Sequence, residues 1–199
     1  MSSKPPRALI SLRRLRIRRF ARDSRGTAAI EFALVTPMML TMYFGMVELS
    51  SGVAINRKVT MVSHTLSDLV AQATAVTNSD IANVFNASSS MMTPYTASPL
   101  TAKVTEVSID STGKATVTCS RAWTYAGGVG TGRAQNAVVT SSIPSGLIVN
   151  NTTLIWSEVS YVYTPTIGYV VKSAITMTDQ FFARPRQSTS VDFSAVTCS

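Results

Sequence analysis

A long apolar run begins at Thr27 and ends at Val47. It reads TAAIEFALVTPMMLTMYFGMV, and Glu31 is its only side chain with a charge at neutral pH. As a helix, these 21 residues extend about 31 Å, which matches a hydrocarbon core of about 30 Å. Pro37 would disturb a helix in water but is tolerated in a bilayer. The pattern predicts a transmembrane helix over residues 27–47.

The apolar positions that follow have the spacing of one helix face. No proline occurs between Glu48 and Ala75, so we predict that the helix extends through residues 48–77. Asn78-Ser-Asp is a helix-start signal, and it predicts a short second helix at Asp80–Asn86. The apolar face comprises Val53, Val59, Val62, Leu66, Leu69, Ala73 and Val76.

Alternation of apolar and polar residues then replaces the helical spacing. Val107 and Ile109 precede a short polar segment, Asp110–Gly113, and the alternation resumes from Ala115 to Trp123. This arrangement predicts a β-hairpin with a short turn.

Two further β-rich runs lie in the C-terminal half, at Leu154–Tyr163 and Ser173–Phe182. Between them and the hairpin, residues 126–151 are rich in Gly, Ser and Asn and predict a loop, with a short strand at 137–140. We expect an antiparallel sheet of about four or five strands packed on the long helix, so the fold class is α+β. Residues 78–199 then form the extracytoplasmic domain.

Charge is distributed very unevenly. Residues 1–26 hold nine of the 18 basic residues and one of the ten acidic residues, so they carry the whole net charge of +8. Cations beside a membrane segment stay in the cytoplasm, which places this basic leader inside the cell and the C-terminal domain across the membrane. Nucleic-acid binding is the alternative for the leader, but the apolar run follows immediately, and the rest of the chain has no net charge.

A secretory signal and a soluble core helix fit the apolar run less well than an anchor does. A secretory signal has a shorter apolar region and then a cleavage site of small residues, whereas Glu48-Leu-Ser-Ser-Gly52 follows here. A buried core helix would not follow nine cations. A single-pass membrane anchor explains both features.

Few residues carry candidate chemistry. Cys119 and Cys198 form neither a Cys-x-x-Cys pair nor a Cys/His cluster, so we expect no metal. In an oxidising compartment they could form a disulfide, and two buried thiols are the alternative. His64 has no catalytic neighbours by motif, and Gly127–Gly132 lacks the ending of a phosphate-binding loop. We expect no cofactor and no enzymatic activity.

The start of the apolar run resembles a known processing signal. Arg25-Gly26 is followed by four small or apolar residues and Glu31, which is the pattern of type IV prepilins. The wider stretch is similar to the N-terminus of TadE-like proteins, pilin-like components of the tight-adherence (Tad/Flp) pilus. Its matching positions are Arg25, Gly26, Ala28, Ala29, Glu31, Phe32, Ala33, Pro37, Gly45 and Glu48.

Two later blocks also look like this family. They are Ile143-Pro-Ser-Gly-Leu147 with Glu158-Val-Ser-Tyr-Val-Tyr-Thr-Pro165, and Phe181-Phe-Ala-Arg-Pro-Arg186. Residues 78–140 match only in general character.

The resemblance implies that a prepilin peptidase cleaves after Gly26, so that Thr27 becomes the N-terminus. Glu31 would then neutralise the new amine of a neighbouring subunit, which favours the ionised carboxylate in a medium of low dielectric. The alternative is that Glu31 reaches the membrane interface or pairs with Arg25. Small residues permit close helix packing against other pilin-like subunits; here they are Ala28, Ala29, Ala33 and Gly45.

These expectations define a pseudopilin that takes part in pilus assembly and adhesion by binding the inner membrane, prepilin peptidase, other pilin-like subunits and pilus assembly proteins. The alternative is an uncleaved, single-pass, membrane-anchored periplasmic scaffold protein. A tethered enzyme would need a polar catalytic cluster, which the sequence does not indicate.

Overall fold

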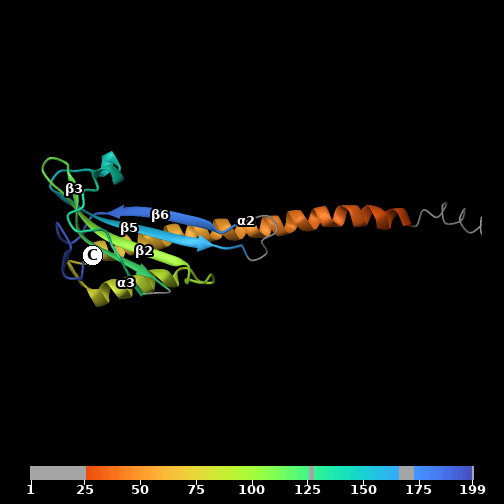
Figure 1. The fold of residues 1–199 in the computed structure, drawn as a ribbon, viewed down its shortest axis with the longest axis horizontal. Coiled ribbons are helices and arrows are strands. Elements are labelled where there is room, and N and C mark those ends of the chain that lie inside the picture. The colour runs from red at the N-terminus through yellow and green to blue at the C-terminus, as the bar shows by residue number, and fades with distance from the viewer. Residues whose placement is uncertain (1–25, 126–127, 166–172, 199) are drawn as a thin grey trace, which may run out of the picture. The chain divides into compact units, whose positions relative to one another are not determined.

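The computed structural model describes residues 26–125, 128–165 and 173–198 (Figure 1). The predicted basic leader therefore lies outside the described residues, apart from Gly26. The chain divides into two compact units, which meet between Met46 and Val47. We call residues 26–46 the anchor segment and residues 47–198 the head, and each is described by itself.

The described elements follow one another in a simple order. Two α-helices come first, with one short strand between them, and the main strands come after the second helix. The elements are α2 (Thr27–Ala71), β1 (Ala75–Thr77), α3 (Asn78–Ser90), β2 (Leu100–Ile109), β3 (Ala115–Thr124), β4 (Gly128–Gly130), the 3₁₀ turns η2 (Thr140–Ser142) and η3 (Ser145–Leu147), β5 (Thr152–Tyr163), β6 (Ile175–Ala183) and β7 (Asp192–Ala195).

The long helix ends earlier than the sequence predicts. It ends at Ala71, whereas the predicted extension runs to residue 77. Thr77 instead takes an extended backbone and forms a capping box with Asp80 at the start of α3. An N-cap residue cannot be helical itself, so the chain must leave α2 before this point. The second helix is longer than predicted and reaches Ser90.

Five strands form an antiparallel sheet in the order β4-β3-β2-β5-β6. The predicted hairpin is confirmed as β2 and β3, which pair from Ile109 and Ala115 outward. Gly113 in its turn has a φ of 82°, a left-handed conformation that glycine adopts without strain. β2 begins at Leu100, earlier than its predicted part, and β5 and β6 lie close to their predicted positions. The predicted α+β class is confirmed.

Two hydrophobic clusters hold the head together, one on each face of the sheet. On the first face, the head part of α2 lies behind β5 and β6 and α3 lies behind β2 and β3, and their contact buries side chains such as Leu66, Phe85 and Trp123. On the other face, the segment between β4 and β5 covers part of the sheet and buries Trp156 and Ile143. This segment, predicted as loop, contains η2 and η3, and a single bridge pairs Val138 with Thr116.

A separate two-stranded sheet closes the C-terminus onto the start of the head. β7 runs parallel to β1, and Ala75 pairs with Asp192. Neither strand was predicted, because each is too short for alternation to be visible in the sequence.

Candidate assembly segment

The anchor segment exposes most of its apolar side chains. Phe32, Met38 and Met46 are 73%, 68% and 73% exposed. Among the described residues, α2 contains one stretch that is long and apolar enough to cross a membrane, and none of that stretch is buried in the protein. The core helix of a soluble protein would be buried. The exposed surface indicates single-pass membrane anchoring.

The predicted processing and assembly residues lie at the start of this helix. Gly26 immediately precedes α2 and is exposed, and Thr27 is the first helical residue. Glu31 follows one turn later and is also exposed. Arg25, the alternative partner of Glu31, lies outside the described residues. The structure thus places Gly26 and Glu31 within about two helical turns of each other.

The four small residues predicted for helix packing do not share one face. At about 100° per residue, Ala29 and Ala33 are about 40° apart around the axis. Ala28 lies about 100° from Ala29, and Gly45 lies about 120° from Ala33. Ala29 and Ala33 therefore offer one surface for close approach, while Ala28 and Gly45 face other directions.

Two hydroxyls within the anchor segment are satisfied by the helix itself. The Thr36 hydroxyl donates to the carbonyl oxygen of Phe32 at 2.6 Å, and the Thr41 hydroxyl donates to that of Pro37 at 2.7 Å. Such bonds remove the cost of placing a hydroxyl in hydrocarbon. The second bond also gives a partner to the carbonyl oxygen of Pro37, which lies inside the helix.

The other acid of the resemblance motif has a different environment. Glu48 is 5% exposed and lies in the head. Glu48 lies close to the Tyr163 side chain. Burial raises the pKa of Tyr163, and the negative charge of Glu48 raises it further. Glu48 is therefore part of the packing between α2 and the sheet.

The anchor segment and α2 carry the match to known proteins. Residues 26–74 match the model of the TadE-like protein family. The resemblance indicated by the N-terminal motif is thereby confirmed for this TadE-like segment, which begins at Gly26 and ends just after α2. The later blocks of the resemblance lie outside the match. No curated protein and no solved structure matches the chain.

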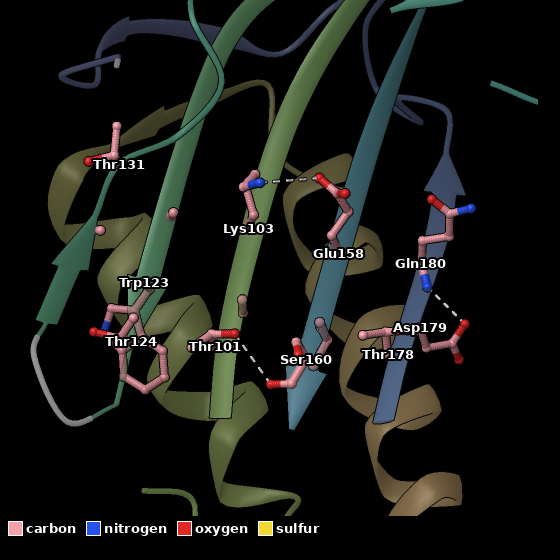
Figure 2. A pocket seen from close by; sticks show the side chains of 14 residues that line it. Thr101, Lys103, Trp123, Thr124, Thr131, Glu158, Ser160, Thr178, Asp179 and Gln180 are labelled. Atoms are coloured by element: carbon pink, nitrogen blue, oxygen red, sulfur yellow. Dashed lines mark hydrogen bonds and ion pairs between the residues drawn. The ribbon is translucent and has the colours of Figure 1, made fainter. Parts of the chain in front are cut away.

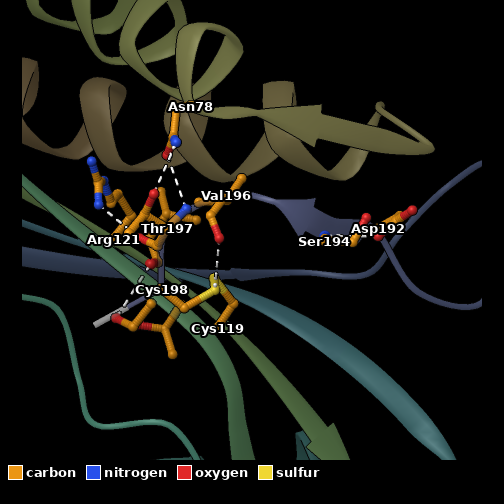
Figure 3. Close-up of a disulfide and its surroundings, with 11 residues drawn as sticks. Asn78, Cys119, Arg121, Asp192, Ser194, Val196, Thr197 and Cys198 are labelled. Atoms are coloured by element: carbon orange, nitrogen blue, oxygen red, sulfur yellow. Dashed lines mark hydrogen bonds between the residues drawn. A yellow bond between two sulfur atoms is a disulfide. The ribbon is translucent and has the colours of Figure 1, made fainter.

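The C-terminal segment is fastened to β3 and to the start of α3 by several bonds (Figure 3). Cys198 forms a disulfide with Cys119 of β3, and their Cα atoms are 5.1 Å apart. Asn78 and Thr197 exchange two hydrogen bonds: the Asn78 amide donates to the Thr197 hydroxyl at 3.0 Å, and the Thr197 N–H donates to Asn78 at 3.1 Å. Arg121 donates to the Thr197 carbonyl oxygen at 2.6 Å.

A buried carboxylate lies beside the disulfide and these hydrogen bonds. Glu106 is 3% exposed, pairs with Cys119 in the β2–β3 register, and accepts a hydrogen bond from the Val191 N–H at 3.1 Å. Burial raises the pKa of Glu106 to about 7; the bond from Val191 opposes this rise, and Asp192 adds to it. Sequence reasoning missed Glu106, although its alternation with Leu100, Ala102 and Val104 was a signal that it belongs to the buried face.

The open part of the other sheet face is a polar groove of about 730 Å³ (Figure 2). Two of its charged residues, Lys103 and Glu158, are paired. Glu158 accepts two hydrogen bonds from Arg133, at 2.8 and 2.9 Å, and its carboxylate lies 3.7 Å from the Lys103 ammonium. Hydroxyls make up much of the remaining lining, in one row across the strands: Thr124, Thr101, Ser160 and Thr178. No sequence pattern indicated the Arg133–Glu158 pair.

The motifs discounted in the sequence have structural roles. The His64 ring packs on the Phe181 ring at a tilt of 32°, with ring centroids 3.7 Å apart. Of the glycine run, Gly127 lies outside the described residues, Gly128–Gly130 forms β4, and Gly132 packs so closely on Ser120 that a Cβ would meet its carbonyl oxygen at 2.5 Å. In the described part of the chain, no group of three metal-ligating side chains is brought together.

Proposed function

We propose that this protein is a TadE-type, pilin-like structural component in the assembly of a Tad/Flp type IV-like pilus or secretion apparatus. It acts by binding, with its anchor segment in the inner membrane and its head in the periplasm. The observation that carries the proposal is the exposed apolar helix that begins directly after Gly26, with Glu31 one turn inside it, within the TadE-like segment.

The orientation has independent support from the head. The Cys119–Cys198 disulfide suits an oxidising compartment such as the periplasm. The cations of residues 1–25 suit the cytoplasmic side. Both arguments favour a head outside the inner membrane.

The proposed processing step is cleavage after Gly26 by a prepilin peptidase. The new amine of Thr27 would then meet the Glu31 carboxylate of a neighbouring helix. An unpaired carboxylate costs about 2.5–3.5 kcal/mol at the centre of a bilayer, and a cation beside it offsets part of that cost. Membrane insertion of the isolated chain does not need Glu31, whereas assembly with neighbours does.

N-terminal sequencing of the protein from membranes, with and without the peptidase, tests the processing. A start at Thr27 that depends on the peptidase is expected. A start at Met1 in both strains would favour the uncleaved, membrane-anchored scaffold protein instead.

Replacing Glu31 tests the assembly role. E31A is expected to insert normally but to reduce pilus number and adhesion. A matched control is Glu48→Gln, whose site lies in the head, so its effect should be on head stability. Normal pili and adhesion in E31A would refute the pairing of Glu31 with a neighbouring amine.

A further inference from the structure

Exposed apolar side chains gather at the end of the head where α2 enters it. Four of them define what we call the apolar collar, and they come from α2, β5 and β6. They are Leu49 (70% exposed), Val53 (49%), Val162 (42%) and Ile175 (42%).

The collar residues lie at one level along α2. A Cβ on Gly52, between Leu49 and Val53, would lie 3.9 Å from the Tyr163 ring. Val162 is the neighbour of Tyr163 in β5, and Ile175 is its partner in β6. The helix, the end of β5 and the beginning of β6 are therefore side by side here.

The collar residues point in different directions around this end. Tyr163 faces α2, so Val162 faces the opposite side of the sheet, because successive side chains of a strand alternate. Ile175 shares the face of Tyr163. Leu49 and Val53 lie on a side of α2 that the head leaves exposed. A flat protein partner would cover one of these directions, whereas a lipid layer surrounds all of them.

The charges near the collar fit a lipid environment. The one acid at this level, Glu48, is buried in the head. The first exposed charge on the head part of α2 is Arg57, one turn beyond Val53. In the sequence, Val159–Val171 and Ser173–Thr178 contain no charged residue; Lys172 stands between these two runs and lies outside the described residues, and Asp179 is the first acid beyond them. Single exposed apolar residues are common on protein surfaces and need no explanation. Four that gather next to a membrane helix need one.

We propose that the apolar collar is immersed in the interfacial layer of the bilayer, with lipid as its partner. Tyr95 lies close to Tyr161 and Tyr163 at the same end and is partly exposed, and tyrosine is enriched at membrane interfaces. The head is then held against the membrane surface on all sides of α2 and cannot tilt freely on it. This inference rests on the membrane anchoring in the proposed function.

The test uses the full chain in vesicles of phosphatidylethanolamine and phosphatidylglycerol. A small environment-sensitive fluorophore is attached to a cysteine introduced by V162C or I175C, after confirming that the native disulfide is intact. Val138→Cys is the matched control, because Val138 is 58% exposed and bridges to Thr116 at the opposite end of the sheet. Leu40→Cys in the anchor segment reports membrane insertion itself.

Lipids with a nitroxide on the headgroup are expected to reduce fluorescence at positions 162 and 175 but not at 138. If positions 162 and 175 respond like 138 while acyl-chain nitroxides quench position 40, the collar proposal is wrong and the anchoring stands. If 162 and 175 are shielded from both lipid nitroxides and aqueous iodide, a protein covers the collar and lipid is not its partner. If position 40 is not quenched, the anchoring fails and the collar proposal fails with it.

Discussion

The Ser157 hydroxyl in β5 donates a hydrogen bond to the carbonyl oxygen of Ser63 in α2, at 2.7 Å, and both residues are fully buried. This bond joins the centre of the sheet directly to the backbone of the helix that becomes the anchor. A hydroxyl buried without a partner would cost stability, so the small side chains here let β5 and α2 approach while the polar atoms of the contact are satisfied.

Replacing Ser157 with Ala removes this bond and leaves a small gap between β5 and α2. We expect the free energy of unfolding to fall by about 0.5–1.5 kcal/mol, measured by chemical denaturation of the full chain in detergent. S160A is the matched control, because Ser160 is on the same strand but faces the groove. Equal effects of S157A and S160A would contradict a specific role for the bond.

The Cys119–Cys198 disulfide closes a long loop, since the two residues are 79 positions apart. A cross-link of this kind stabilises a protein by about 2–4 kcal/mol, mainly by constraining the unfolded chain. The C119S/C198S double variant is therefore expected to unfold at lower denaturant concentration. Protein recovered from membranes should move differently on gels with and without reductant. Free-thiol labelling of the native, unreduced protein would show that the bridge is not formed.

The raised pKa of Glu106 predicts that the head loses stability as pH rises. Its pKa is raised to about 7 in the folded protein, from an ordinary value of 4.5, so folding favours the protonated form. The stabilising contribution is complete below about pH 4.5 and is lost as pH rises through 7. Stability of the wild type should therefore fall between pH 5 and pH 8, and E106Q should flatten this dependence. Asp80, Asp110 and Asp192 titrate below this window, because hydrogen bonds lower their pKa values. Identical pH profiles for wild type and E106Q would refute the assignment.

Arg133 fastens the segment between β4 and β5 onto the sheet. Its guanidinium carbon lies 4.0 Å from the centre of the Trp156 ring while its nitrogen bonds Glu158. Truncation to Ala should lower stability by about 1–2 kcal/mol. R133K keeps the charge but not the planar, two-point contact, so it should restore only part of the loss. Full restoration by R133K would mean that charge alone matters; the measurement is thermal unfolding followed by Trp fluorescence.

In the anchor segment, Ala33→Leu should weaken association with neighbouring helices, because Ala29 and Ala33 form the shared small-residue face. Ala28→Leu, about 100° away from Ala29, is the control. Co-purification of pilin-like subunits after mild detergent extraction measures the difference. If A28L weakens association as much as A33L does, the partner helix is not approached through the Ala29–Ala33 face.

The sequence alone determined the features that depend on local patterns. Residues 27–47 are apolar with one charge, so their hydropathy predicts a lipid environment without knowledge of the fold. The β2–β3 hairpin was predicted because its turn and its alternation are neighbours in the chain. The Gly26–Glu31 spacing is equally local, and it led to the TadE-like segment. Helix spacing indicated correctly that α2 continues into the head, but its end at Ala71 depends on the cap that Thr77 provides for α3.

The tertiary structure decided what depends on distant pairing. β1 and β7 exist as strands only because residues 75–77 and 192–195 meet, and three or four residues carry no period of their own. The environment of Glu106 is set by three separate parts of the chain: its own strand β2, Cys119 of β3 and the backbone of Val191. The same is true of Arg133, whose partners Trp156 and Glu158 follow more than twenty residues later. A sequence specifies which side chains are available. The desolvation that shifts the pKa of a carboxylate, and the pairing that fastens a loop, come from the packing of the whole head.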